Sequence, residues 1–163
     1  MTKKDFIINS DLAPYVNCII VGESTDTGSH TNIPLYADGY PGIMFQQSKH
    51  GFHLLPKNKK LSELFLYGQT VDPASLNVEG TYSYIVVQLY PFASRYLLNV
   101  DPKVLNDDCF DLLQLDSVDA EGFRQQLAQA DNHEQQVAII LELMRELIRV
   151  HQVPENDKIE QAI

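Results

Sequence analysis

The sequence contains no tryptophan and only two cysteines, Cys18 and Cys109. Both cysteines lie in apolar stretches and have no paired spacing of the Cys-x-x-Cys kind. This pattern indicates reduced core residues and argues against a disulfide framework or a cysteine metal site.

Basic residues are also scarce. Lysine and arginine number 12 against 22 aspartates and glutamates, which gives a formal net charge of -10. A field of this sign repels phosphate backbones and anionic lipid headgroups, so we do not expect this chain alone to bind nucleic acid or a membrane. The one basic run, KNKK at 57–60, follows Pro56 and is typical of a solvated loop.

Long hydrophobic runs are missing as well. No stretch approaches the length of a membrane span, and the first ten residues, MTKKDFIINS, do not resemble a signal peptide. We therefore expect a cytoplasmic protein. A chain of 163 residues that is 44% hydrophobic can bury a full core and is expected to form one main domain.

The strong catalytic and metal-binding signatures are absent too, so we expect no enzyme activity and no cofactor. Among the five histidines, only His50 and His53 are close in sequence. Residues three apart on a strand face opposite sides, so a turn at Gly51 would be needed to bring both imidazoles to one ion. Separate roles for a loop histidine and a strand histidine are the more common arrangement.

The first ninety residues predict short strands separated by glycine and proline. The segments 15–23, 42–46, 51–55, 62–70 and 81–90 are rich in β-branched and aromatic residues. This pattern is typical of a small antiparallel β-barrel or sandwich. In the last of these segments, Ile85, Val87 and Leu89 form a plain core face. The opposite face carries Tyr82, Tyr84, Val86, Gln88 and Tyr90. We expect such a face to pack under a helix, which is common for half-buried tyrosine, and the alternative is that it lines a small-molecule pocket.

After Pro91 the pattern becomes helical. A short helix is expected directly after this proline, a second within 117–130, and a long helix within 131–153 that Asp131 or Asn132 caps and Pro154 ends. The long helix has a wide apolar face that includes Ile140, Met144 and Leu147. Either a partner subunit shares this face, as in a homodimer, or the other short helices cover it. The predicted fold class is therefore α+β, a cupin-like β-barrel or sandwich followed by C-terminal α-helices.

An ordered series of short motifs between residues 11 and 150 carries a family resemblance. The series is DLAPYVN at 11–17, ADGYPGIMFQ at 37–46, LFLYGQ at 64–69, YIVVQLYPFASRYLL at 84–98, LNDDCFDL at 105–112 and the closing helix. In order and spacing it resembles the N-terminal regulatory domain of AraC-type bacterial transcription regulators. Cupin enzymes share the expected barrel shape, but the chain lacks their His-x-His motif.

The resemblance implies a domain that senses an effector and forms dimers, while a separate C-terminal helix-turn-helix domain binds DNA. Residues 1–153 would be the regulatory domain, and 154–163 a linker and the truncated start of the DNA-binding domain, because Ile159, Ala162 and Ile163 have helical spacing. The candidate dimer contacts are Ile140, Met144 and Leu147. The candidate pocket residues, which mix aromatic surface with a few polar groups, are Tyr82, Tyr84, Gln88 and Tyr90 with Phe45, Tyr67 and Gln69. The alternatives are a cupin-like binding protein or metal-dependent enzyme, and a dimerisation module without a ligand.

Overall fold

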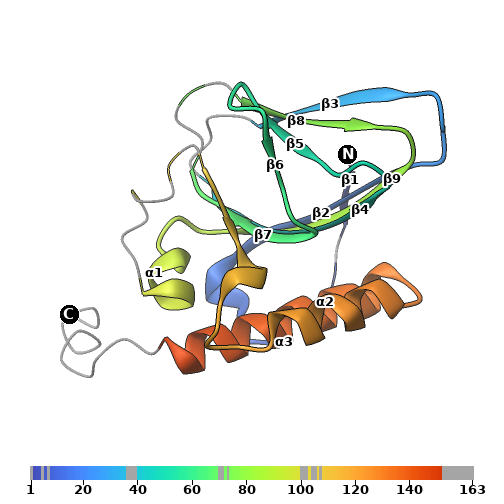
Figure 1. Ribbon diagram of the computed structural model, residues 1–163. Coiled ribbons are helices and arrows are strands. Elements are labelled where there is room, and N and C mark those ends of the chain that lie inside the picture. The colour runs from blue at the N-terminus through green and yellow to red at the C-terminus, as the bar shows by residue number, and fades with distance from the viewer. Residues whose placement is uncertain are drawn as a thin grey trace.

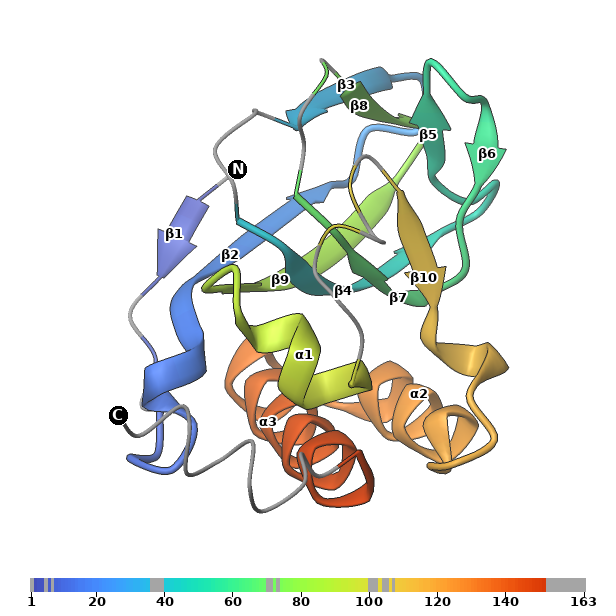
Figure 2. The same ribbon diagram turned by 90° about the vertical axis from the view of Figure 1, so that its left-hand side faces the viewer.

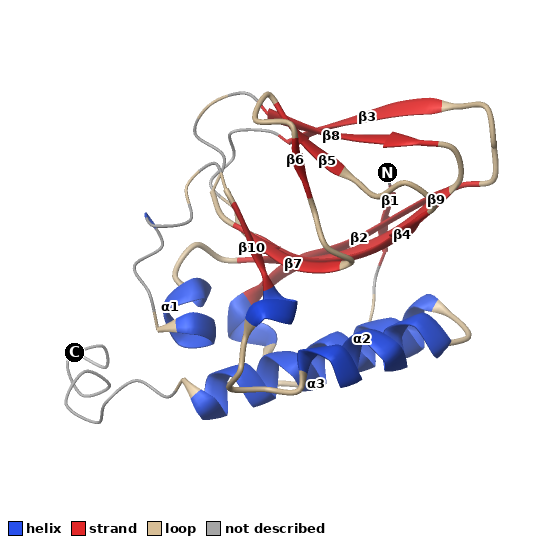
Figure 3. Cartoon of the chain, viewed as in Figure 1, coloured by secondary structure: helices blue, strands red, loops and turns tan. Residues whose placement is uncertain are grey.

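The chain folds into three layers: a small sheet, a large sheet and a layer of helices (Figure 1). The structure is a computed structural model that describes residues 2–4, 6, 8–35, 40–69, 72, 74–99, 103, 106 and 108–151. Figure 3 shows the strands gathered on one side and the helices on the other. This arrangement is an α+β sandwich, as the sequence predicts.

The large sheet has six strands in the order β1-β2-β9-β4-β7-β10, and neighbouring strands pair antiparallel. Its strands are β1 (Thr2–Lys4), β2 (Val16–Ser24), β4 (Gly42–Ser48), β7 (Leu64–Tyr67), β9 (Tyr82–Leu89) and β10 (Cys109–Asp111). The small sheet has four strands in the order β3-β8-β5-β6. They are β3 (His30–Leu35), β5 (His53–Leu55), β6 (Lys59–Lys60) and β8 (Ala74–Glu79).

Each of the five strands expected from the sequence is present, with its ends shifted by a few residues. The strands β1, β3, β6, β8 and β10 were not predicted. Two of them, β3 and β8, pair with each other over six residues, although Pro34 lies within β3. Proline is tolerated there because β3 is an edge strand of the small sheet.

The helices form the layer beside the large sheet. They are α1 (Ala93–Leu98), α2 (Ala120–Gln129) and α3 (His133–Val150), with short 3-10 turns at Ala13–Tyr15 and Leu112–Gln114. Asn132 caps α3, since its side chain accepts a hydrogen bond from the backbone N–H of Gln135 at 2.9 Å. The cap at Asn132 was one of the two predicted. The helix ends at Val150, and the predicted linker and helix start at 154–163 lie outside the described residues.

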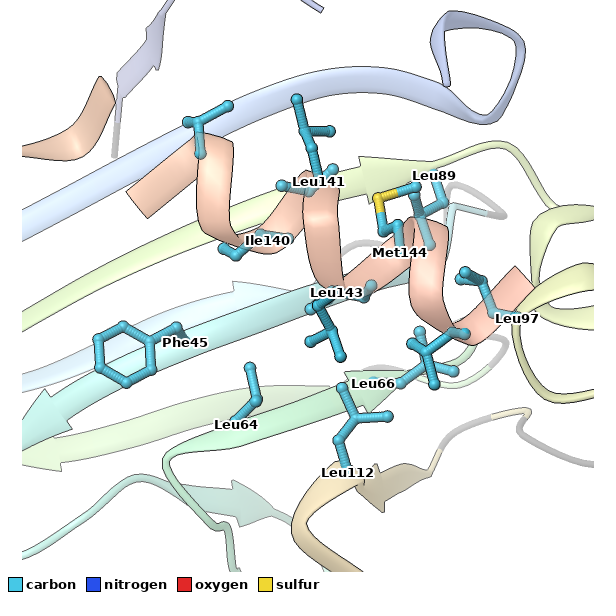
Figure 4. Close-up of a cluster of buried hydrophobic side chains, with 14 of the residues drawn as sticks. Phe45, Leu64, Leu66, Leu89, Leu97, Leu112, Ile140, Leu141, Leu143 and Met144 are labelled. Atoms are coloured by element: carbon cyan, nitrogen blue, oxygen red, sulfur yellow. The ribbon is translucent and has the colours of Figure 1, made fainter. Parts of the chain in front are cut away.

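Two hydrophobic cores lie on the two faces of the large sheet. One core joins this sheet to the helices, and Figure 4 shows Met144 of α3 beside Leu89 of β9, and Leu97 close to the same helix. The other core lies between the two sheets and includes Phe52, Leu54, Leu76 and Tyr84. Alternate residues of β9 therefore belong to different cores, because successive side chains on a strand point to opposite faces.

The expectation that the tyrosines pack under a helix is wrong. The face that α3 covers carries Ile85, Val87 and Leu89, whereas Tyr84 and Val86 pack against the small sheet. Figure 2 shows the same arrangement from the side, with α3 below the large sheet and β3 and β8 above it. A sequence period of two separates the two faces of β9 but does not say which neighbour lies on each.

The apolar face of α3 is covered by its own chain. Ile140, Met144 and Leu147 are all 0% exposed in the single chain, and they belong to the core that also contains Leu97 of α1. These three side chains are therefore internal and do not form an accessible surface for a partner subunit. Of the two interpretations left open by the periodicity, the internal one describes this face.

Candidate functional site

Three of the candidate pocket residues share the face of the large sheet that is turned to the small sheet. Tyr84 and Gln88 lie on this face of β9, and Tyr67 lies on the same face at the end of β7. Tyr82 packs against the same core and stacks on Tyr84, with ring centroids 5.9 Å apart. The strand period thus brings these side chains together, as the sequence predicts.

The strand register places five residues in one row across this face. Cys18 pairs with Gln88, Gln88 with Gly42, Gly42 with Tyr67, and Tyr67 with Cys109. Gly42 and Cys109 each begin a strand and Tyr67 ends one, so the row lies at one end of the core between the sheets. We call these five residues the terminal row.

A glycine makes room for each of the two buried tyrosine rings. A Cβ atom at Gly42 would lie 2.6 Å from the hydroxyl oxygen of Tyr67, and one at Gly22 would lie 2.4 Å from Tyr84 Cζ. Real Cβ atoms do not approach other atoms so closely, so both rings lie over glycine in the neighbouring strand. The glycines are thus part of what positions the aromatic surface.

A β-bulge brings two polar groups to one atom of Gln88. The register of β2 against β9 shifts between Val16 and Cys18, which leaves Asn17 as the extra residue. The Asn17 amide donates to Gln88 Oε1 at 2.7 Å, and the Cys18 thiol donates to the same oxygen at 3.2 Å. The Gln88 amide nitrogen, which carries two N–H donors, forms no hydrogen bond with a described residue.

Two buried groups on this face, Tyr84 and Cys109, hold their protons at pH 7. Burial, and to a smaller degree the nearby Tyr82, raises the pKa of Tyr84 to about 12. Burial also raises the pKa of Cys109 to about 12, although the positive charge of Lys59 acts in the opposite direction. A neutral thiol is a poor nucleophile, so the Cys109 thiol is not activated for chemistry.

The other candidate pocket residues lie elsewhere. Phe45 points to the opposite face of the large sheet and belongs to the core under the helices (Figure 4). Gln69 follows β7 and is half-buried. Tyr90 follows the end of β9, where its ring stacks on Phe92 and lies near Tyr40.

Tyr90 belongs to an aromatic cluster near α1 that the sequence analysis did not single out. Phe92 lies at its centre, with ring centroids 5.9 Å from Tyr15 and 6.1 Å from Tyr96. Phe92 is 46% exposed, whereas burial raises the pKa of Tyr15. The cluster fastens the segment after β9 to the turn before β2 and is separate from the terminal row.

The histidines do not form a metal site in the described part of the chain. No group of three or more histidine, cysteine, aspartate or glutamate side chains is placed there to hold an ion. His53 pairs with Lys60 and Asn77 across the small sheet, while His50 is exposed in the preceding bend. His30, on β3, lies within 2.8 Å of the Asn77 amide and 3.7 Å from Glu79.

Sequence reasoning missed three members of the terminal row, Cys18, Gly42 and Cys109, and also Asn17, which donates to Gln88 from the adjacent bulge. Glycine inside a strand is a signal of close backbone or ring approach, and it was available at Gly22 and Gly42. The neighbours across the sheet had no such signal, since pairing register is set by the whole fold.

Residues 8–111 match the family described as a domain of unknown function, DUF6597, and this is more than half of the chain. The chain belongs to this family. The DUF6597 region runs from the segment before β2 to the end of β10, so it contains both sheets except β1 and includes the whole terminal row. Searches of curated proteins and of solved structures gave no match. None of the helices in the described ranges is long and apolar enough to cross a membrane.

Proposed function

We propose that this chain is a non-catalytic regulatory domain that senses a small, uncharged effector at the terminal row. The main support is Gln88. Its oxygen accepts hydrogen bonds from Asn17 and Cys18, its nitrogen has no partner among the described residues, and the ring of Tyr67 lies over Gly42, the residue paired with Gln88. A few fixed polar groups beside aromatic rings are typical of small-molecule sites.

The position of β9 couples such a site to the packing of the helices. Gln88 and Tyr84 are on one face of this strand, and Val87 and Leu89 on the other face pack in the same core as α3. A ligand that favours one position of β9 would therefore bias the packing of α3. A change of this kind is a population shift and needs only a difference in ligand affinity between two arrangements.

The resemblance of residues 11–150 to AraC-type regulators supplies the wider proposal. The chain would act in a homodimer, and DNA would be bound by a helix-turn-helix domain beyond it. The formal charge of -10 agrees with this division, since an acidic domain is poorly suited to contact DNA itself. The dimer contact would use a surface other than Ile140, Met144 and Leu147, which are buried in one chain.

A thermal-shift screen tests the sensor. The chain is heated with sugars, small acids, aromatic compounds and metal ions, and the variant Gln88→Met is treated in the same way. We expect a saturating rise of the melting midpoint with an uncharged compound, because a ligand that binds only the folded state stabilises it. The rise should be absent in Gln88→Met and present in the control Gln125→Met, which changes an exposed residue of α2.

Two results would contradict the sensor. If no compound class shifts the midpoint, the alternative of a dimerisation module without a ligand becomes the better description. If a compound stabilises Gln88→Met as strongly as the unchanged chain, the ligand binds away from the terminal row.

A further inference from the structure

The positive charge of this acidic chain is concentrated in one segment. Residues 47–60 contain four lysines and no aspartate or glutamate, within a chain of formal charge -10. This stretch, which we call the basic segment, forms β5 and β6 and the turns around them. Lys57 and Lys59 both form ion pairs with Asp108, at 3.8 and 2.9 Å.

The remaining two lysines are unpaired. Neither the Lys49 nor the Lys60 side chain forms an ion pair or hydrogen bond with any residue that the structure describes. Both are exposed, and both line a cavity of about 530 Å³ between this segment and α2. The cavity is large enough for a small metabolite. Its polar lining includes Ser48, Lys49, His50, Lys60, Ser62 and Arg124.

The carboxylates of this cavity are already occupied. Arg124 donates from Nε to both carboxylate oxygens of Glu121, at 2.9 and 3.0 Å, and from Nη1 to Glu63 at 3.4 Å. The hydrogen bond to Glu121 is the main reason that the pKa of Arg124 is raised. One guanidinium thus holds both acids, which leaves the two lysine ammonium groups to meet a ligand.

The wall of the cavity is fixed by buried hydrogen bonds. Gln46 is 2% exposed; its amide donates to the Ser62 carbonyl at 2.9 Å, and its oxygen accepts from the Ser48 hydroxyl at 3.2 Å. Gly51 has a φ of 80°, and a Cβ atom there would lie 3.1 Å from Lys60 Cε. The missing side chain lets the stem of Lys60 pass over the turn toward the cavity.

A second cavity adjoins the first. It has a volume of about 430 Å³, and Lys49 and His50 line both. His30 and Glu79 line the second cavity from the small sheet. The loop that contains Lys49 and His50 therefore lies between the two cavities. The Lys49 ammonium group can contact a ligand in the larger cavity.

We propose that the cavity between the basic segment and α2 binds the phosphate group of a small molecule. Lysine binds phosphate as a compact charge, and the hydroxyl groups and His50 add donors that a phosphate oxygen accepts. The site shares no residue with the terminal row, so it does not depend on the effector proposed above.

Titration with sodium phosphate, followed by amide NMR spectra at constant ionic strength, tests the proposal. Constant ionic strength removes the general screening effect of salt. We expect saturable shifts of the amides around residues 48–51 and 60–63. The double variant Lys49→Gln/Lys60→Gln should bind phosphate at least about tenfold more weakly, a difference of about 1.4 kcal/mol.

The control is Lys57→Gln together with a titration of succinate. Lys57 is in the same segment, and its replacement removes one positive charge, as each substitution of the double variant does. It does not line the cavity. Affinity for phosphate should stay within about twofold in this variant. Shifts that never saturate, an equal loss of affinity in Lys57→Gln, or binding of succinate in preference to phosphate would each overturn the proposal. A melting curve for each variant shows that the fold is intact.

Discussion

At the scale of single residues, two glycines have the most specific role. Gly22 lies near the end of β2 and Gly42 at the start of β4, and each lies beneath a tyrosine ring of a neighbouring strand. The rings of Tyr84 and Tyr67 can approach the backbone only because these positions lack a side chain.

Replacement of Gly22 by alanine is therefore expected to destabilise the fold by about 1–3 kcal/mol, since the added methyl group must displace the buried ring of Tyr84. Urea denaturation measures the change. The matched control is Gly28→Ala, where the nearest atom to the new Cβ is 3.7 Å away and the expected change is within about 0.5 kcal/mol. Equal stability of the two variants would show that Tyr84 does not lie over Gly22.

The raised pKa of Tyr84 predicts a loss of folding stability in alkaline solution. Its pKa is about 12 in the folded chain against an ordinary value of 10.0, so the folded state keeps the proton more firmly than the unfolded state. The stabilisation is complete below pH 10 and is lost as the pH rises through 12. We expect Tyr84→Phe to lose less stability than the unchanged chain above pH 10, as measured by urea denaturation. An identical pH dependence would contradict this assignment.

At the scale of elements, β9 is the strand shared by both cores. Its odd residues Ile85, Val87 and Leu89 face the helices, and Tyr84 and Val86 face the small sheet. This alternation could be predicted from the sequence. The neighbours could not, because Phe45 on β4 has a strand pattern equally compatible with either face until the sheet order is known.

The missed strands have a similar explanation. In β8, only Leu76 and Val78 are buried, and Ser75, Asn77 and Glu79 alternate with them, so the segment is less apolar than the predicted strands. In β10, three residues pair with β7, which is too few for a local pattern. Helices α1, α2 and α3 were predictable, since the proline before α1, the cap of α3 and periodic apolar positions are local signals.

The burial of α3 predicts the result of a charge substitution. Met144 is 0% exposed, so Met144→Glu should place a carboxylate in the core and remove cooperative folding, at a cost of several kcal/mol. Met144→Leu keeps the volume and should cost less than about 1.5 kcal/mol. Circular dichroism during urea denaturation measures both. A folded, monomeric Met144→Glu would instead support the interpretation that a partner subunit covers this face.

At the scale of the whole molecule, the proposed homodimer can be tested by mass. Sedimentation should give twice the 18.5 kDa of one chain at high concentration and an approach to the single mass on dilution. Met144→Leu should not change this equilibrium, because the residue is internal. A single-chain mass at every concentration would remove the dimer from the proposal.

The edges of the two sheets have a consequence for aggregation. An exposed edge strand offers unpaired backbone groups to which another chain can add, and proteins block this with short strands, lysine or proline. The small sheet ends in β6, which consists of Lys59 and Lys60, and in β3, which contains Pro34. Lys59 also reaches across to Asp108, next to the edge strand β10 of the large sheet. The lysines of the basic segment thus make this side of the sandwich unfavourable for the edge-to-edge addition of a second copy.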